Sequence, residues 1–75
     1  MTERNIKLKN IKDIEAFNKL CTKFECDMDL VSGKYYINAK SIMGIFSLDL
    51  DYPLKLVAAT EDADKIDDTF KNFIT

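Results

Sequence analysis

Lys40-Ser41-Ile42-Met43-Gly44-Ile45-Phe46-Ser47-Leu48 is the stretch of this sequence that says most about its fold. Ser41 is a good N-cap candidate, since a serine hydroxyl can accept a hydrogen bond from the backbone of a helix's first turn. The run after Ser41 is apolar on almost every side, and a helix of about two turns cannot bury all of it against a core. The stretch therefore predicts a short surface helix from which Met43 and Phe46 face outward.

Strand patterns flank this helix on both sides. Before it, residues 28–30 and 35–39 alternate between apolar and polar around Ser32-Gly33-Lys34, which predicts a β-hairpin that turns at those residues. After it, Asp51-Tyr52-Pro53 predicts a turn, and residues 54–58 alternate as a further strand. The middle of the chain should therefore run strand, strand, helix, strand.

The two ends of the chain add one strand and two helices. Residues 5–9 alternate and predict the first strand. From residue 11 to 24, apolar side chains recur every three or four positions, which predicts an amphipathic helix with Asn10 as its N-cap. The last helix is predicted to begin in the acidic stretch 60–64, because negative charge favours a helix start. The apolar stripes of these helices comprise Ile11, Ile14, Phe17, Leu20, Cys21 and Phe24 in the first, and Ala63, Ile66, Phe70, Phe73 and Ile74 in the last.

The predicted element order is β-α-β-β-α-β-α, without repeats or linkers. Every predicted strand alternates and none is a continuous apolar run, so the sheet should be antiparallel with one face in water. A chain of 75 residues makes one domain. We therefore expect a single α+β domain over residues 1–75, with a four-stranded antiparallel sheet and three helices on one face.

Composition excludes several classes of function. The sequence contains no histidine, so it offers no imidazole base, no phosphohistidine and no His-ligated metal. Its formal net charge of −2 argues against direct binding to nucleic acid. No run approaches the ~20 apolar residues of a membrane span, and no signal-peptide pattern is present, so we expect a cytoplasmic protein with no membrane contact. The sequence also shows no motif for a cofactor or a metal, and we expect neither.

The two cysteines and the acidic stretch are the remaining places for chemistry. Cys21 and Cys26 would point in different directions on a helix, so we expect reduced thiols, and a pair without a third ligand is a poor zinc site. The acidic stretch 60–64 lacks the glycine and the ligand spacing of a calcium loop. An enzyme that depends on one of the thiols is the third alternative, but Cys21 lies on an apolar stripe where thiols are normally inert. We expect the protein not to be an enzyme.

The element order and residues 40–48 together resemble HPr, the small phosphocarrier of the bacterial phosphoenolpyruvate-dependent sugar phosphotransferase system. The Lys-Ser-Ile-Met-Gly run that opens the short second helix of that family is intact at residues 40–44. Residues 22–30, which read Thr-Lys-Phe-Glu-Cys-Asp-Met-Asp-Leu, resemble the end of its first helix and its second strand. The resemblance covers most of the chain and implies the open-faced sandwich of the family.

The resemblance also locates a phosphohistidine site that has lost its histidine. In the family this histidine caps the first helix and is followed by a small residue, an arginine and a proline. Counting back without gaps from Leu30 puts Asn10 at the histidine, Lys12 at the arginine and Asp13 at the proline. An amide nitrogen is delocalised into its carbonyl and cannot hold a transferable phosphoryl group. The resemblance thus implies a degenerate site at Asn10 and Lys12.

The second family site is a regulatory serine, the target of an ATP-dependent kinase, and Ser41 occupies its place. Beside it, Lys40, Ile42, Met43 and Phe46 correspond to a surface that docks partners. The implied partners are an HPr kinase/phosphorylase-like enzyme and a transcriptional regulator or other phosphotransferase-system proteins. We therefore predict a regulatory or adaptor protein in carbon catabolite control. The alternative is an HPr-fold interaction module with no phosphorylation role, in which Ser41 only caps its helix.

Overall fold

Seven elements follow one another along the chain in the computed structural model, which describes residues 1–75. They are β1 (Thr2–Ile6), α1 (Ile11–Thr22), β2 (Met28–Ser32), β3 (Tyr35–Asn38), α2 (Ile42–Phe46), β4 (Leu54–Ala58) and α3 (Ala63–Thr69). This is the predicted order. None of the helices has both the length and the apolar character needed to span a bilayer.

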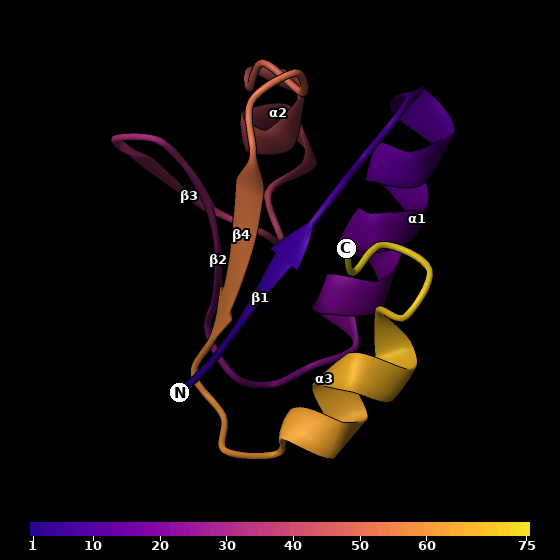
Figure 1. Cartoon of the computed structure of the whole chain (residues 1–75), viewed down its shortest axis with the longest axis vertical. Coiled ribbons are helices and arrows are strands. Elements are labelled where there is room, and N and C mark those ends of the chain that lie inside the picture. Colours follow the sequence, from indigo (N-terminus) through magenta and orange to yellow (C-terminus); the bar gives the residue numbers. More distant parts are fainter.

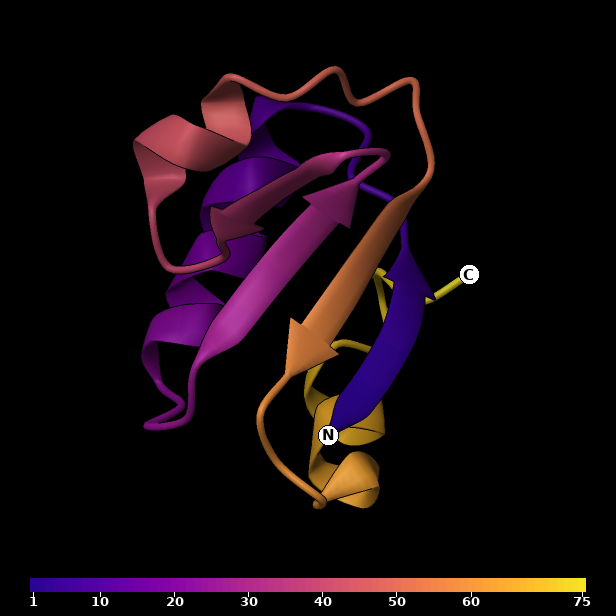
Figure 2. The ribbon, with the colours of Figure 1, turned by 90° about the vertical axis from the view of Figure 1, so that its left-hand side faces the viewer.

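The four strands form one antiparallel sheet in the order β1-β4-β2-β3. All three helices lie on the same side of this sheet (Figure 1), and the opposite face is uncovered (Figure 2). The arrangement follows from the alternation along the strands: in β2, Met28 and Leu30 are buried under the helices, whereas Asp29 between them is exposed. The predicted α+β sandwich is confirmed.

The core lies between the sheet and the helices. Leu30 of β2 and Leu56 of β4 are fully buried and directly opposite each other in the register. Phe17 of α1 is fully buried too, and its ring centroid lies 5.3 Å from that of Phe70 and 5.9 Å from that of Phe73. Burial of each such side chain is worth about 1.5–3 kcal/mol. This cluster therefore holds α1 and the C-terminal segment against the sheet.

The hairpin between β2 and β3 turns where it was predicted to turn. Gly33 has a φ of +57°, a left-handed conformation that glycine adopts without steric cost. Only two residues, Gly33 and Lys34, separate the strands. This tight hairpin leaves β3 as one outer edge of the sheet.

The first strand lies earlier than predicted. β1 spans Thr2–Ile6 rather than residues 5–9, because residues 2–6 are the ones that pair with β4. Ile6 and Leu8 are both buried, so the alternation correctly indicated burial. Leu8 lies in the loop that leads to α1, yet it is buried. Alternation over a few residues cannot distinguish such a buried loop residue from a residue of a strand.

The two predicted helical stripes also extend past their helices. α1 ends at Thr22 and α3 at Thr69, yet Phe24 and Phe73 are buried from the turns that follow them. Ile11 differs from the prediction in the opposite way, because it lies within α1 but is 61% exposed. Its assignment to the buried stripe is wrong. The buried face of α1 therefore begins at Ile14, which is 3% exposed.

Candidate functional site

The start of α1 is capped by side chains of its own first turn. Asn10 has an extended backbone, with φ −157° and ψ −179°, and its Oδ1 accepts a hydrogen bond from the backbone N–H of Asp13 at 2.9 Å. The carboxylate of Asp13 in turn accepts from the backbone N–H of Lys9 at 2.9 Å. The first bond is an N-cap, and the second differs from a capping box because Asp13 bonds the residue before the N-cap. The predicted capping role of Asn10 is confirmed.

The same cap makes the start of α1 a poor seat for a phosphoryl group. Anions bind at helix N-termini because free backbone N–H groups point at them. Here the Asn10 side chain already accepts from the Asp13 N–H, which is one of these donors. The Asp13 carboxylate, which accepts from the Lys9 N–H just before the helix, adds a negative charge that repels another anion. Lys12 is exposed two residues after Asn10. The geometry therefore favours a structural role for Asn10.

Loss of this cap should have a measurable cost. Asn10→Ala is expected to lower the free energy of unfolding by about 1 kcal/mol, because Asp13 loses the acceptor of its backbone N–H. Urea denaturation followed by circular dichroism measures the change. Asn10→Ser, which keeps a capping oxygen, serves as the control and should stay within about 0.5 kcal/mol of the native protein. Equal stability of the alanine and native proteins would contradict the capping role.

Ser41 opens α2, as predicted. Its backbone is extended, with φ −94° and ψ 102°, and its Oγ accepts a hydrogen bond from the backbone N–H of Gly44 at 3.4 Å. This distance is long for a hydrogen bond, so the cap is weak. A Cβ added at Gly44 would lie 3.4 Å from the Ser41 Oγ, so glycine leaves space around the hydroxyl. Ser41 itself is exposed.

Lys40 makes a contact that the sequence does not indicate. Its Nζ donates a hydrogen bond to the backbone carbonyl of Phe24 at 2.6 Å, in a partly buried position. The ammonium group thus holds the segment after α1 against the residues that precede α2. The predicted docking role of Lys40 stays a prediction, and its charge is already engaged within the protein.

The apolar residues of α2 divide between the core and the surface. Ile45 is fully buried and Ile42 is half-buried against the core. Met43 is 75% exposed and Phe46 is 42% exposed, as the short helix predicts. We call these two side chains the α2 patch. Ile42 was also predicted to take part in docking. Because it is half-buried against the core, only part of its side chain is available to a partner.

Several exposed apolar side chains were missed in the sequence. Ile11 lies next to Asn10, and the views agree that α2 and the start of α1 lie at the same end of the molecule (Figures 1 and 2). The tyrosines Tyr35, Tyr36 and Tyr52 are 70%, 71% and 64% exposed. Their positions beside turns were the only sign in the sequence that they are exposed. The alternation of residues 35–39 instead places Tyr35 on the same side as Ile37, toward the helices.

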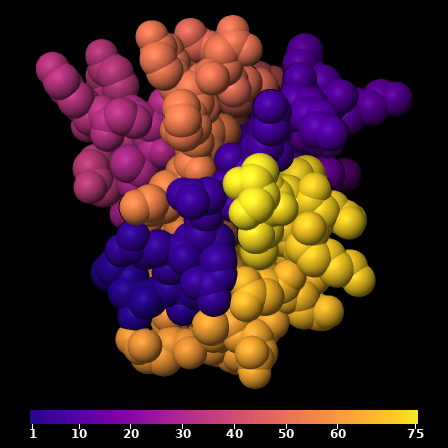
Figure 3. All heavy atoms as spheres, viewed as in Figure 1, coloured from indigo at the N-terminus to yellow at the C-terminus, as the bar shows by residue number.

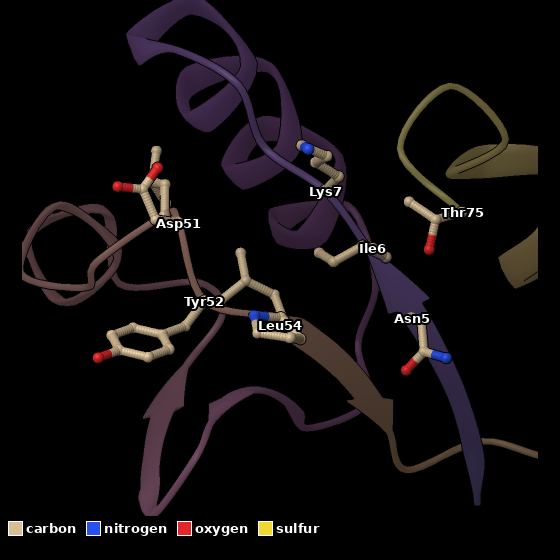
Figure 4. Close-up of a pocket in the computed structure, with 9 residues that line it drawn as sticks. Asn5, Ile6, Lys7, Asp51, Tyr52, Leu54 and Thr75 are labelled. Carbon is tan, nitrogen blue, oxygen red and sulfur yellow. The ribbon is translucent and has the colours of Figure 1, made fainter.

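The two main hollows of the surface lie away from the predicted site residues. One, of about 440 Å³, is lined by the end of β1 and by residues 50–54, with Asn5, Lys7 and Thr75 on one side and Asp51 and Leu54 on the other (Figure 4). The other, of about 710 Å³, lies between the β2–β3 hairpin and residues 47–52. Neither includes Asn10, Ser41 or the α2 patch. These residues therefore form an outer surface, which suits protein docking better than the enclosure of a small substrate.

The thiols are placed unfavourably for catalysis. Cys21 is fully buried, and this burial raises the pKa of its thiol to about 12, although the nearby Lys40 ammonium opposes the shift. A thiol with such a pKa holds almost no thiolate near neutral pH. Cys26 is half-buried in the loop after α1. No group of three or more His, Cys, Asp or Glu side chains is arranged to hold a metal ion.

A family model and several solved structures match this chain. The PTS-HPr family model, described as the PTS HPr component phosphorylation site, matches residues 4–75. HPr-C-His from Thermoanaerobacter tengcongensis is similar in structure, with a TM-score of 0.79 and 28% identity over 96% of this chain and 89% of that chain. The phosphocarrier protein HPr of Bacillus anthracis str. Ames has a TM-score of 0.74 and 22% identity over 99% of this chain and 96% of its own.

A third solved structure, the histidine-containing phosphocarrier protein from Mycoplasma, has a TM-score of 0.72 and 20% identity over 95% of this chain and 86% of its own. At these identities the Bacillus and Mycoplasma proteins support the fold alone. Among curated proteins, no sequence matches this chain. The family model nevertheless covers nearly all of the chain, and the β-α-β-β-α-β-α sandwich agrees with the similar solved structures. The chain belongs to the HPr family, whose members are phosphocarriers of the bacterial sugar phosphotransferase system.

Proposed function

We propose that this chain is a regulatory or adaptor protein of the phosphotransferase system that carries no phosphohistidine and acts through Ser41 and the α2 patch. One observation carries most of the proposal: the sequence has no histidine. Asn10, which the resemblance aligns with the phosphohistidine, is a helix cap close to the Asp13 carboxylate. Phosphoryl relay needs a nucleophile that can both accept and release the group. An amide beside a carboxylate offers neither function.

Phosphorylation at Ser41 would act on the patch beside it. The Ser41 hydroxyl is exposed and only weakly bound to Gly44. A phosphate adds a charge of about −1.5 to −2 at pH 7. At the start of α2 the helix dipole stabilises it by about 0.3–1 kcal/mol. Because Met43 lies two residues away, the phosphate would place strong negative charge at the rim of an apolar surface, and a partner with a basic rim would then bind more tightly.

The chemistry of the α2 patch supports a protein partner. Methionine and phenylalanine adapt well to different surfaces and contribute strongly at the centres of interfaces. We propose as partners an HPr kinase/phosphorylase-like enzyme and a transcriptional regulator or other phosphotransferase-system proteins, in the cytoplasm. The Ser41→Asp variant should bind such a regulator more tightly than Ser41→Ala.

Incubation with an HPr kinase and ATP tests the phosphorylation step. We expect one phosphate per chain, which mass spectrometry of proteolytic fragments places on Ser41. Ser41→Ala should take up none, and Ser47→Ala, which removes a hydroxyl at the other end of α2, should be labelled like the native protein. Labelling of Ser47 instead, or of no residue, would contradict the assignment.

A second candidate function has its own support. The Ser41 Oγ accepts from the Gly44 N–H, so a capping role is sufficient to explain a serine there. In that case the chain is an HPr-fold interaction module with no phosphorylation role. Absence of kinase labelling together with retained binding through Met43 and Phe46 would favour this candidate.

A further inference from the structure

The two edges of the sheet are protected to different degrees. Beside β1, the C-terminal segment covers the edge: the backbone N–H of Lys7 donates to the Phe73 carbonyl at 2.8 Å, and that of Thr75 donates to the Asn5 carbonyl at 3.1 Å. β3 ends the sheet on the other side, with no strand beyond it. Its four residues, Tyr35–Asn38, carry no charge. Proteins usually block such an edge with charge, proline or a covering segment. β3 contains neither charge nor proline, and α2 contacts it near Ile37.

The backbone of Tyr36 is directed outward from this edge. Bonded and non-bonded residue pairs alternate along an antiparallel ladder. The N–H of Ala39 donates to the Met28 carbonyl of the neighbouring strand at 2.9 Å, so residues 35, 37 and 39 are those that bond inward. Tyr36, which pairs with Val31, therefore points its N–H and C=O away from the sheet. Its side chain is 71% exposed and lies on the face of the sheet that the helices leave uncovered.

A hollow lies directly beside this edge. It measures about 710 Å³ and is lined by Tyr35 and Ile37 of β3 and, across from them, by Leu48 and Tyr52. The hairpin stands out from the body of the molecule in the space-filling view, where its residues are magenta (Figure 3). Side chains on one face of an added strand recur every second residue. A strand added to β3 would therefore direct alternate side chains over the hollow.

We propose that β3 pairs antiparallel with β3 of a second copy of this chain, with Tyr36 opposite Tyr36 across a two-fold axis. The strand is complementary to itself in this register. Tyr35 lies opposite Ile37 of the second copy on the helix side, twice, and aromatic residues pair well with β-branched ones. Lys34 lies opposite Asn38, so no like charges meet.

The pairing joins the sheets of the two copies into one. In each copy, the hollow beside β3 is covered by uncharged side chains of the other copy. Because the contact is the same patch on both copies, it closes as a dimer and does not grow into a fibre. An edge of four residues is short for an interface, since stable dimers bury about 1,200–2,000 Å². The association should therefore be weak, with a Kd of about 0.1–1 mM.

Analytical ultracentrifugation of the native chain between about 0.02 and 2 mM measures this association. Tyr36→Lys puts two positive charges face to face and should raise the Kd at least about tenfold, and Tyr36→Glu should do the same. An equal mixture of the two variants should associate again, because opposite charges then meet. Asn72→Lys, which adds the same charge at an exposed position beyond α3, should associate like the native chain.

A proline variant tests whether association occurs through the β3 edge or through another surface. Among the backbone donors of β3, Tyr36→Pro removes only the outward N–H of residue 36, so every bond from β3 to β2 is kept. Its two-dimensional NMR spectrum should therefore be that of a folded protein, while its association is lost. A native chain that stays monomeric at about 2 mM overturns the proposal. The proposal is also overturned if the Tyr36→Pro variant still forms a dimer and the added substitution Met43→Ser abolishes it, since the α2 patch would then be the contact.

Discussion

Phe17→Ala is expected to lower the free energy of unfolding by about 3–5 kcal/mol. Phe17 is fully buried and contacts the rings of both Phe70 and Phe73, so its removal opens a cavity between α1 and the C-terminal segment. The rings of Phe70 and Phe73 are held in the C-terminal segment and can collapse only partly into that space. A loss of this size is a large part of the total stability of a small domain. Urea denaturation monitored by circular dichroism measures it.

Ile11→Ala is the control for this prediction. It removes a large apolar side chain from the same helix, but Ile11 is 61% exposed, and the cost should stay within about 0.5 kcal/mol. The periodicity of the sequence places both residues on one stripe, whereas the structure separates them. Similar losses for the two variants would mean that α1 is rotated about its axis relative to the sheet.

Asn10→His alone is expected to be phosphorylated poorly by phosphoenolpyruvate and the first enzyme of the system, and Asn10→His/Asp13→Asn at least about ten times faster. The Asp13 carboxylate lies at the start of α1 and accepts from the Lys9 N–H, so it would face the incoming phosphoryl group. Repulsion between unit charges about 5 Å apart at an effective dielectric constant of 20 is about 3 kcal/mol. We expect solvent to reduce this repulsion energy to roughly 1.4 kcal/mol or more. A difference of that size in the activation free energy changes the rate about tenfold.

Acid-labile radioactive label on the protein measures this reaction. The native chain should take up none, and Asn10→His/Asp64→Asn, which removes a carboxylate from α3, should behave like Asn10→His alone. Label on the native chain would overturn the proposed function itself. Equal rates for Asn10→His and Asn10→His/Asp13→Asn would leave that function intact but show that Asp13 does not block the site.

Much of the fold could be predicted because its signals are local. Ser41 as a cap, the turn at Gly33 and the alternation in residues 54–58 all depend on neighbours within a few positions, and the structure confirms each one. The resemblance of residues 40–48 to the HPr family then supplied the topology. Boundaries were less predictable, since Leu8 and Phe24 show the same apolar pattern whether they lie inside an element or just beyond it.

The exposure of the α2 patch was predictable, but the contacts of the residues around it were not. Met43 and Phe46 are exposed because a short helix has too little area beneath it, which its length alone implies. The engagement of Lys40 by the Phe24 carbonyl joins residues 16 positions apart and depends on how α1 ends. The bond from the Lys9 N–H to the Asp13 carboxylate, beside which we predict that phosphate is repelled, could not be predicted from the sequence either.

The sequence by itself determined the chemical inventory and the order of the elements. A chain without histidine has no phosphohistidine in any fold, and the periods of its apolar residues specify strand or helix from their neighbours alone. Only the tertiary structure decided which of these residues meet and which stay free, such as the ammonium of Lys40, the side chain of Ile11 and the edge at Tyr36. The physical reason is that periodicity describes a residue relative to its own element. Burial, charge pairing and free hydrogen-bonding edges depend on how that element docks against others far away in the chain.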